Sequence, residues 1–411
     1  MKIIQLAYSN YIGGASIAAN RIHYSLCKNN IDSELWVNET LSKKLDCKKP
    51  YDKIEKKLRK LRRYITWPLL KTIKTTIPIH HSISLLPSNW VTRINESDAD
   101  IVNLHWIQRE MLSIKDISKI KKPIVWTLHD MWAFCGAEHY TNDNRWREGY
   151  NFNNRPSYES GFDLNKWTWR RKQKHWKNPI QIITPSSWLA NCARESKLMS
   201  NWPVSVVANP INTEVFKPMD KKIALKKLNL PNNVPLILFG ALGGDKDHRK
   251  GFDLLIKALE HLKNEIKVKD IEIVVLGQSK PKSSPNLGFP IHYMGRHNDD
   301  ISLRLVYSSV DAMVIPSRQD NLPNMGVEAQ ACGIPLIAFN IGGLPDIAEH
   351  KKTGYLAEPF NVEDLANGIT FILDKSKTKQ LANNARERAI KKFSEKRISE
   401  DYLKIYEKLL I

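Results

Sequence analysis

The chain has 411 residues and a formal net charge of +20, with 42% hydrophobic and 26% charged residues. This length suggests two or three domains, and the apolar content excludes a disordered chain. No run of about 18 apolar residues occurs, and the N-terminal segment turns polar after one short strand, so neither a membrane span nor a signal peptide is expected and the protein should stay in the cytoplasm.

The first half of the chain alternates short apolar strands with helical segments. Its first strand ends before Gly13-Gly14, and an apolar helical pattern follows. This alternation favours a largely parallel sheet of Rossmann type. Strands are expected at 3–8, 34–37, 101–104, 124–128, 180–183 and 204–207, and helices at 114–120 and 188–198.

After a polar connection at 209–218, the same alternation begins again. The fold class expected is α/β, with two doubly wound parallel-sheet domains over 1–210 and 211–395. Segment 142–163, in contrast, is predicted to be a long polar loop. Strands are expected at 235–240, 271–276, 291–294, 312–315, 336–339 and 354–356, and helices at 252–262, 301–307, 325–332, 362–373, 378–392 and 396–410.

The most informative stretch follows the strand at 312–315. Pro323 suits a helix start, so the backbone N–H groups of 324–326 would face the crevice at the carboxyl end of the sheet, where a diphosphate can bind. Asp320 precedes that helix and Glu328 lies in its first turns, so both carboxylates could accept hydrogen bonds from one sugar or ribose. The alternative is a carboxylate paired with the helix dipole and an ordinary surface Glu.

The spacing from Asp320 to Glu328 resembles the signature of family 4 of the retaining glycosyltransferases: an acidic residue, seven others, then Glu, running into an Ala-rich Cys-Gly-x-Pro segment. The usual first acid is Glu, so Asp320 is a departure. The resemblance implies a GT-B architecture of two facing Rossmann-like domains, with the donor mainly on the C-terminal one, the acceptor mainly on the N-terminal one, and the final helix, 396–411, crossing back. Further matching segments are 13–15, 125–130, 209–210, 249–252 and 342–346.

The cations beside Gly251 and a strand-end histidine complete the expected catalytic set. Lys250 matches the family lysine and, with Arg249, would neutralise the departing diphosphate, whereas a solvated basic loop is the alternative. The family's arginine slot reads Gly240-Ala241 here, so Arg249 is assigned that role. The resemblance implies that His129 contacts the donor sugar near the reacting carbon and that Asp320 positions the substrate. A capping role is the alternative for His129.

Other donor and acceptor contacts are expected around this set. Gly13 and Gly14 would let backbone N–H groups approach a phosphate, and Arg296 is a candidate neighbour of the base. Additional donor contacts are Asn321, Leu322, Pro323, Asn324 and Glu328. The segment 134–158 mixes aromatic and polar side chains suited to a sugar acceptor. Acceptor contacts are expected at His105, His139, Tyr140, Arg145 and Trp146, although a structural role for His105 stays equally open.

The predicted activity is retaining transfer of a sugar from a UDP- or GDP-linked donor to a glycan or lipid-linked glycan, in surface polysaccharide or lipopolysaccharide assembly. No cofactor and no metal is expected, because no metal-binding pattern occurs and cations can act in a metal's place. Alternatives are a nucleotide-sugar epimerase or a phosphorylase. A nucleic-acid-binding protein would need a recognisable basic module, which the sequence lacks, so no nucleic acid partner is expected.

A basic segment at 43–74 carries Ile54, Leu58, Leu61, Ile65 and Leu69 at helical spacing, with Trp67 and Pro68 near its end. Such a helix could lie on the anionic inner face of a membrane, which would favour a lipid-linked acceptor. Packing of the apolar stripe against its own domain is an equal alternative, and Pro68 is expected to interrupt the helix.

Overall fold

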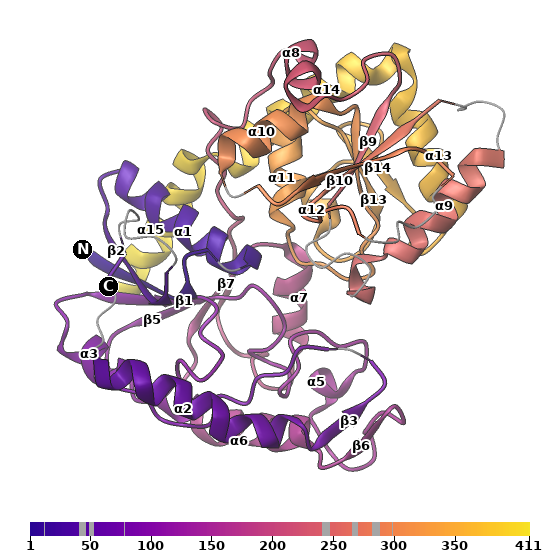
Figure 1. Ribbon diagram of the computed structural model, residues 1–411. Helices are drawn as coiled ribbons and strands as arrows, with labels where there is room; N and C mark the ends of the chain where they lie inside the picture. The colour runs from indigo at the N-terminus through magenta and orange to yellow at the C-terminus, as the bar shows by residue number, and fades with distance from the viewer. Residues whose placement is uncertain are drawn as a thin grey trace. The chain divides into compact units, whose positions relative to one another are not determined.

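The computed structural model divides the chain into two compact units, Met1–Ala208 with Ile398–Ile411, and Asn209–Arg397 (Figure 1). Each unit has its own six-stranded sheet. The residues that the structure describes are 1–11, 13–40, 47–48, 53–77, 79–240, 247–264, 270–281, 288–297 and 299–411.

The sheet of the first unit is parallel throughout and has the order β2-β1-β4-β5-β7-β8. Its strands are buried on both faces, so they read in sequence as continuous apolar runs. The reversal of strand order falls between β1 and β4. The strands are β1 (Lys2–Ser9), β2 (Asp32–Glu39), β4 (Ile101–Leu104), β5 (Ile124–Thr127), β7 (Gln181–Thr184) and β8 (Val204–Val206). A separate antiparallel pair joins β3 (Ile73–Thr75) to β6 (Glu159–Gly161).

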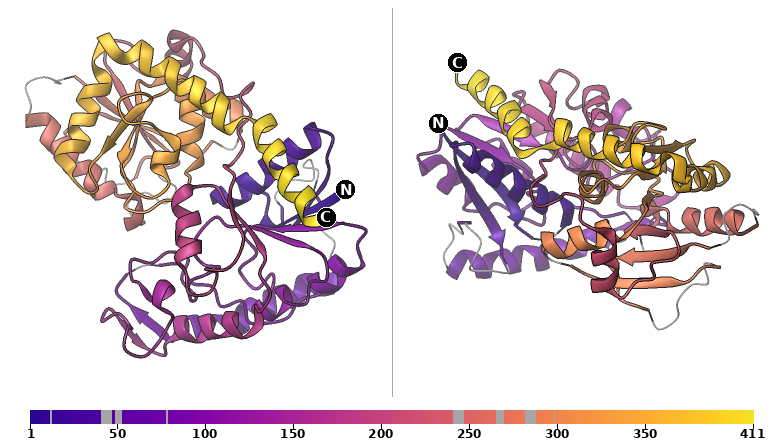
Figure 2. Two further views of the ribbon diagram at one scale, coloured as in Figure 1. Left: turned by 180° about the vertical axis from the view of Figure 1, so that it is seen from behind. Right: turned by 90° about the horizontal axis from the view of Figure 1, so that it is seen from above.

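Helices cover both faces of this sheet. The α1 helix and the C-terminal α15 helix lie on one face, where Tyr402 and Tyr406 of α15 are fully buried among β-strand residues such as Ile3 and Val125 (Figure 2). A larger core rich in tryptophan fills the other face. The helices are α1 (Gly13–Lys28), α2 (Lys53–Leu70), α3 (Trp90–Glu96), α4 (Ile114–Ile117), α5 (Arg145–Glu148), α6 (Leu164–His175), α7 (Ser187–Glu195) and α15 (Glu395–Leu410).

The second unit repeats the doubly wound arrangement, with the strand order β11-β10-β9-β12-β13-β14 and parallel pairing throughout. Its strand order reverses between β9 and β12. The strands are β9 (Leu236–Gly240), β10 (Glu272–Leu276), β11 (Ile291–Gly295), β12 (Ala312–Ile315), β13 (Leu336–Phe339) and β14 (Gly354–Ala357).

Figure 1 shows α9 and α13 on one face of this sheet and α8, α10, α11 and α14 on the other. The α9 and α13 side chains pack against alternate residues of the strands, such as Ile237, Phe239 and Val314. The helices are α8 (Lys221–Leu228), α9 (Phe252–Asn264), α10 (Asp300–Ser309), α11 (Asn324–Ala331), α12 (Leu344–Ile347), α13 (Val362–Leu373) and α14 (Lys375–Phe393).

The strands expected in both halves are confirmed, and so is the α/β fold class. The prediction that 142–163 is loop throughout is wrong, because this segment contains the short α5 helix and the β6 strand. The interruption expected at Pro68 is also wrong, since α2 contains this residue and ends only at Leu70. Within the described part of the chain, no helix is long and apolar enough to cross a membrane.

Candidate functional site

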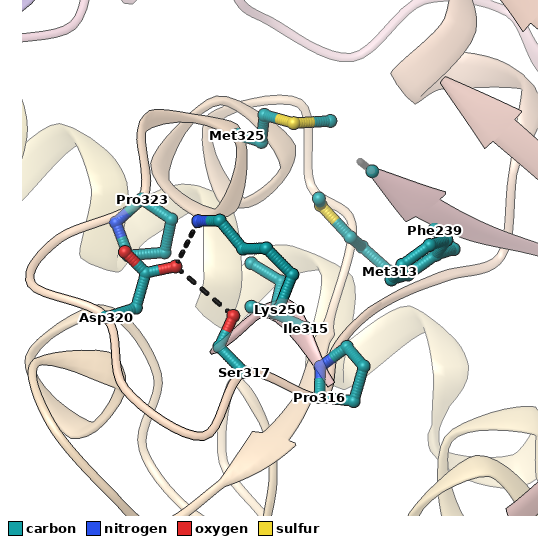
Figure 3. A pocket seen from close by; sticks show the side chains of 10 residues that line it. Phe239, Lys250, Met313, Ile315, Pro316, Ser317, Asp320, Pro323 and Met325 are labelled. Atoms are coloured by element: carbon teal, nitrogen blue, oxygen red, sulfur yellow. Dashed lines mark hydrogen bonds and ion pairs between the residues drawn. The ribbon is translucent and has the colours of Figure 1, made fainter. Parts of the chain in front are cut away.

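A small pocket lies at the carboxyl ends of β9 and β12, where the strand order of the second sheet reverses (Figure 3). At such a point, the connections that follow two adjacent strands lead to opposite faces of the sheet, which leaves a crevice for ligands. The pocket is lined by apolar side chains and by two charged groups. Its lining consists of Phe239, Gly240, Lys250, Met313, Ile315, Pro316, Ser317, Asp320, Pro323 and Met325.

The two charged groups of the pocket, Lys250 and Asp320, form an ion pair. The Lys250 Nζ lies 2.7 Å from Asp320 Oδ2, and the Ser317 hydroxyl donates to the same oxygen over 3.2 Å (Figure 3). The backbone N–H of Asn321 donates to the other carboxylate oxygen over 3.1 Å. Three donors therefore hold the Asp320 side chain in place. The ammonium has three N–H donors, so it can bind a ligand oxygen beside Asp320.

A short 3₁₀ turn, His248–Lys250, places Lys250 in the pocket. Asp247 caps this turn by accepting a hydrogen bond from the Arg249 N–H, and Gly251 ends it with φ +67°. The Arg249 carbonyl accepts from the Arg318 N–H at 2.7 Å. The turn and the 316–318 segment are thus joined directly, which fixes Lys250 relative to the segment that carries Ser317 and Asp320.

We expect Gly251→Ala to lower the free energy of unfolding by about 2 kcal/mol or more. Gly251 has a left-handed backbone, and a Cβ there would lie 1.9 Å from the Pro316 carbonyl oxygen. Urea unfolding measures the change. Gly13→Ala is the control, because Gly13 is also left-handed, with φ +78°, but a Cβ there meets no atom within 4 Å. Equal losses in both variants would contradict the proposed close contact with Pro316.

A glycine turn anchors the Asp320 backbone. The Gly343 N–H donates to the Asp320 carbonyl over 3.0 Å, and a Cβ on Gly342 would lie 2.4 Å from the same oxygen. Gly342 has φ +59°, a conformation that glycine adopts without strain. The segment 342–346, one of those that carried the family resemblance, therefore holds the Asp320 backbone in place.

The α11 helix begins at the rim of the pocket. Pro323 is its N-cap residue, and both Pro323 and Met325 line the pocket. The positive end of the helix dipole thus lies beside Lys250, and both favour an anion. Asn324 lies on the same turn, where its side-chain oxygen accepts a hydrogen bond from the Asn209 amide over 3.2 Å. Asn321 and Leu322 are buried in the preceding loop.

Three other donor-site predictions have different surroundings. Glu328 is 3% exposed and lies outside the lining of this pocket, where its carboxylate accepts a hydrogen bond from the Tyr307 hydroxyl over 2.6 Å. The Arg249 guanidinium pairs with Asp247 at 2.7 Å. Arg296 is exposed just after the edge strand β11. Ala241, in the family's arginine slot, lies outside the described residues. The structure thus brings together Lys250, Asp320 and the start of α11.

In the first unit, a chain of hydrogen bonds fixes His129, which follows β5. Its Nε2 lies 3.1 Å from His105 Nδ1, and His105 Nε2 lies 2.8 Å from the Gln5 side-chain oxygen. The amide oxygen only accepts, so His105 Nε2 carries the proton and His105 Nδ1 accepts from His129. Burial lowers the pKa of His129 to about 4. The neutral His129 ring therefore keeps Nδ1 as its acceptor atom.

The C-terminal helix holds the other end of this chain. The Gln5 and Asn103 amides both donate to the Tyr406 hydroxyl, over 3.2 and 3.0 Å, and Asn103 also donates to the Gln5 oxygen. All three side chains are fully buried. Because a buried polar group costs free energy when its partner is lost, this network should keep the histidines in one arrangement. The Tyr406 hydroxyl thus provides a partner for both buried amides.

We expect the melting temperature to fall as the pH is lowered from about 6.5 towards 5. Burial holds the pKa of both His105 and His129 below the ordinary value of 6.5, so the unfolded chain binds protons in this range that the folded chain does not. Stability then falls as pH falls. Thermal unfolding of wild type and His105→Gln across this range measures the effect, and the variant should show a shallower slope. Identical slopes would contradict this account.

The predicted acceptor residues lie mostly in the interior of the 130–163 segment. Arg145 is 1% exposed and pairs with Glu159 and Asp163, and Trp146 is also buried. His139 bonds to the Asp130 carboxylate at 2.6 Å and to the Ser82 hydroxyl at 2.9 Å. Only Tyr140 of this segment's predicted residues is half-buried. Direct sugar contact by Arg145, Trp146 and His139 stays a prediction that their burial does not favour.

A buried lysine that was not predicted holds the loop after β5. Lys172 of α6 is fully buried, and its ammonium donates to the carbonyls of Trp132, Cys135 (3.0 Å) and Gly136 (2.7 Å). It lies 3.8 Å from the centre of the Trp132 ring. In the sequence, Lys172 is one cation of several in Arg170–Lys174, so nothing marks it as the buried one.

Gly13 and Gly14 lie exposed at the start of α1. The open space beside Gly13 leaves room for close approach of a ligand to the backbone. Within the described ranges, no group of three or more His, Cys, Asp or Glu side chains is placed to hold a metal ion.

Solved structures identify the fold. A sucrose-phosphate synthase from Thermosynechococcus elongatus is 18% identical, with a TM-score of 0.65 over 100% of this chain and 99% of that one. Alr3699/HepE from Anabaena, solved in complex with UDP-glucose, is 16% identical, with a TM-score of 0.62 over 99% of this chain and 100% of that one. The chain has the GT-B fold.

A known family matches much of the second unit. Residues 220–391 match the family described as Glycosyl transferases group 1. A relative from Campylobacter jejuni, N,N'-diacetylbacillosaminyl-diphospho-undecaprenol alpha-1,3-N-acetylgalactosaminyltransferase, is 26% identical over 240 residues, which are 56% of this chain and 61% of that protein. The chain spans about half the length of the curated relatives it matches.

Proposed function

We propose that the chain is a retaining glycosyltransferase that moves a sugar from a UDP- or GDP-linked donor to a glycan or lipid-linked glycan. The observation that carries this proposal is the Lys250–Asp320 pair beside the start of α11, at the switch point of the second sheet. The match of residues 220–391 to the Glycosyl transferases group 1 family supports it, and so does the complex of the structurally similar Alr3699/HepE with UDP-glucose.

In this proposal, the second unit binds the donor. Lys250 and the N-terminal end of α11 attract the diphosphate and stabilise the charge that develops as it leaves. Asp320 holds Lys250 and accepts hydrogen bonds from the donor. Because an ammonium and a helix terminus already supply positive charge, transfer should proceed without a metal ion.

Turnover of a panel of nucleotide sugars in EDTA tests this function. Release of UDP or GDP would identify the donor, and NMR of the transferred sugar's anomeric proton would show whether its configuration is retained. Lys250→Ala and Asp320→Ala should strongly slow the release. Formation of an isomeric free sugar without any acceptor would support an epimerase instead, and phosphate-dependent cleavage of a glycan would support a phosphorylase.

We also propose that α2 docks on an anionic membrane and brings the enzyme to a lipid-linked acceptor, in surface polysaccharide or lipopolysaccharide assembly. The described part of α2 turns its polar face inward: Glu55, Arg59 and Thr66 are buried. The Arg59 guanidinium donates to the Asn38 carbonyl, and Arg62 pairs with Glu55. Leu58, Leu61 and Ile65 of the apolar stripe are exposed, whereas Leu69 packs against the buried cluster of Ile83, Ala137 and Leu164.

Five apolar or aromatic side chains of α2 are exposed, by 39% to 76% of their area: Leu58, Leu61, Tyr64, Ile65 and Trp67. The neighbouring cations Lys57, Lys60 and Arg63 are exposed as well. An apolar stripe flanked by cations matches the interface of an anionic bilayer, and Trp67 is suited to its headgroup region. Residues 43–46 and 49–52 of the predicted basic segment lie outside the described residues. Enzyme docked in this way would work on the cytoplasmic side of the membrane.

Co-sedimentation with vesicles tests the docking. Wild type should bind vesicles of phosphatidylglycerol and phosphatidylcholine in equal parts, and bind phosphatidylcholine alone weakly. Replacing both Leu61 and Ile65 by Glu should weaken binding about tenfold or more, because two apolar side chains that would enter the bilayer are lost. Ile301→Glu, at an exposed isoleucine of α10, is the control. Equal binding by the double variant and wild type would rule out docking through α2.

A further inference from the structure

The first sheet has its own switch point, between the carboxyl ends of β1 and β4. The backbone N–H of Tyr8, near the end of β1, donates to the carbonyl of Trp106, just after β4, over 2.8 Å. Open parallel sheets bind ligands at such a point. The segment that follows Trp106 was not among the predicted site residues, and it carries Arg109.

Arg109 presents a cation at this switch point. Its guanidinium carbon lies 5.4 Å from the centre of the Tyr8 ring and 5.5 Å from that of Trp106. The side chain is half-buried, and no carboxylate among the described residues pairs with it. A guanidinium held over rings keeps its N–H donors in its own plane, where they can reach a phosphate or carboxylate.

The backbone at Arg109 is held in an unusual conformation. Arg109 and Glu110 have φ of +57° and +60°, and two successive left-handed residues without glycine cost about 1–3 kcal/mol each. The buried Glu110 carboxylate offsets this cost by accepting hydrogen bonds from the backbone N–H groups of Leu85 and Leu86, at 2.8 and 3.0 Å. The left-handed backbone at Arg109 and Glu110 is therefore kept in the folded protein despite its cost in free energy.

Polar aromatic groups surround the guanidinium. The exposed His80 ring stacks on Trp106, with 6.1 Å between ring centres. The Trp106 indole N–H donates to Asp130 over 3.0 Å, and Asp130 also bonds to His139 and to the Trp132 N–H. The Asp130 carboxylate is thus occupied by three donors. Arg109 and His80 are left at the surface of the cluster.

We propose that Arg109 and His80 bind an acceptor sugar that carries an anionic group, with Trp106 and Tyr8 as the platform that positions the guanidinium. The ligand chemistry is a phosphate or carboxylate attached to a sugar: Arg109 takes the anion by paired hydrogen bonds, and His80 bonds to a neighbouring hydroxyl. This inference rests on the proposed function, because it specifies the acceptor class of the same enzyme.

Binding of simple probes to the full-length protein tests this site. Isothermal titration with glucose 1-phosphate, glucuronate and methyl α-glucoside should show binding of one or both anionic sugars and none of the neutral one. The anionic sugar that binds more tightly shows whether the site prefers a phosphate or a carboxylate. Titrations are done in Lys250→Ala, so that the second unit does not contribute. Arg109→Asn, which tolerates a left-handed backbone, should weaken the anionic sugar tenfold or more.

The control is Arg170→Asn, at an exposed arginine of α6, which should leave the affinity unchanged. The inference is overturned if no anionic sugar binds, if the neutral sugar binds equally, or if Arg109→Asn binds like its parent. UDP and GDP binding by the protein with Lys250 intact is measured separately. If a nucleotide binds and no anionic sugar does, only this inference fails; if no nucleotide binds, the proposed function fails.

Discussion

Lys250→Ala is expected to lower kcat/KM for sugar transfer about 10²–10³-fold. The Lys250 ammonium lies in the pocket at the carboxyl end of the second sheet, 2.7 Å from Asp320, where a diphosphate would gain charge during transfer. A positive charge that acts on a leaving group stabilises the transition state more than the bound substrate. Most of the loss should therefore appear in kcat.

Steady-state rates with the identified donor measure this effect, and Lys257→Ala, at an exposed lysine of α9, is the matched control. The control should change kcat/KM less than about twofold, because its charge lies in water and is screened. If Lys250→Ala and Lys257→Ala had similar rates, Lys250 would have no role in the chemistry. Asp320→Ala should also lose activity, since Lys250 then lacks the partner that positions it.

Lys172→Met is expected to lower the free energy of unfolding by about 3 kcal/mol or more. The ammonium occupies three backbone carbonyls of the loop after β5, and methionine of similar length leaves all three without it. Each buried acceptor that loses its partner costs about 1–3 kcal/mol. Relief of the charge's own burial, which lowers the pKa of Lys172 to about 7, offsets part of that cost.

Urea unfolding followed by tryptophan fluorescence measures the Lys172→Met effect. Lys174→Met on the same helix is the control, because Lys174 is exposed. It should change stability by less than about 0.5 kcal/mol. A Lys172→Met variant as stable as this control would show that the carbonyls find other partners and that Lys172 does not hold the loop.

The strands and their alternation with helices could be predicted from sequence because buried parallel strands are continuous apolar runs. The α6 helix could not, since its buried face includes Asn165, Thr168 and Lys172 and so breaks the apolar periodicity. The inward face of α2 is polar as well, and the spacing of its apolar residues does not show which of them are exposed.

The Lys250 and Asp320 pairing could be anticipated only through the family resemblance, because the two residues are 70 positions apart. Local sequence features predicted the start of α11 at Pro323. The interactions of Glu328 and Arg109 depend on which distant side chains pack beside them, and spacing along the chain carries no such information. The same limit applies to the buried histidine chain.

The most direct measurement of the central claim is thermal unfolding of the protein in EDTA with a panel of nucleoside diphosphates and nucleotide sugars. A ligand that binds only the folded state raises the melting temperature. The account predicts that a uridine or guanosine diphosphate raises it in wild type and raises it less in Lys250→Ala and Asp320→Ala. If no nucleotide raises the melting temperature of wild type, the pocket at β9 and β12 is not a donor site.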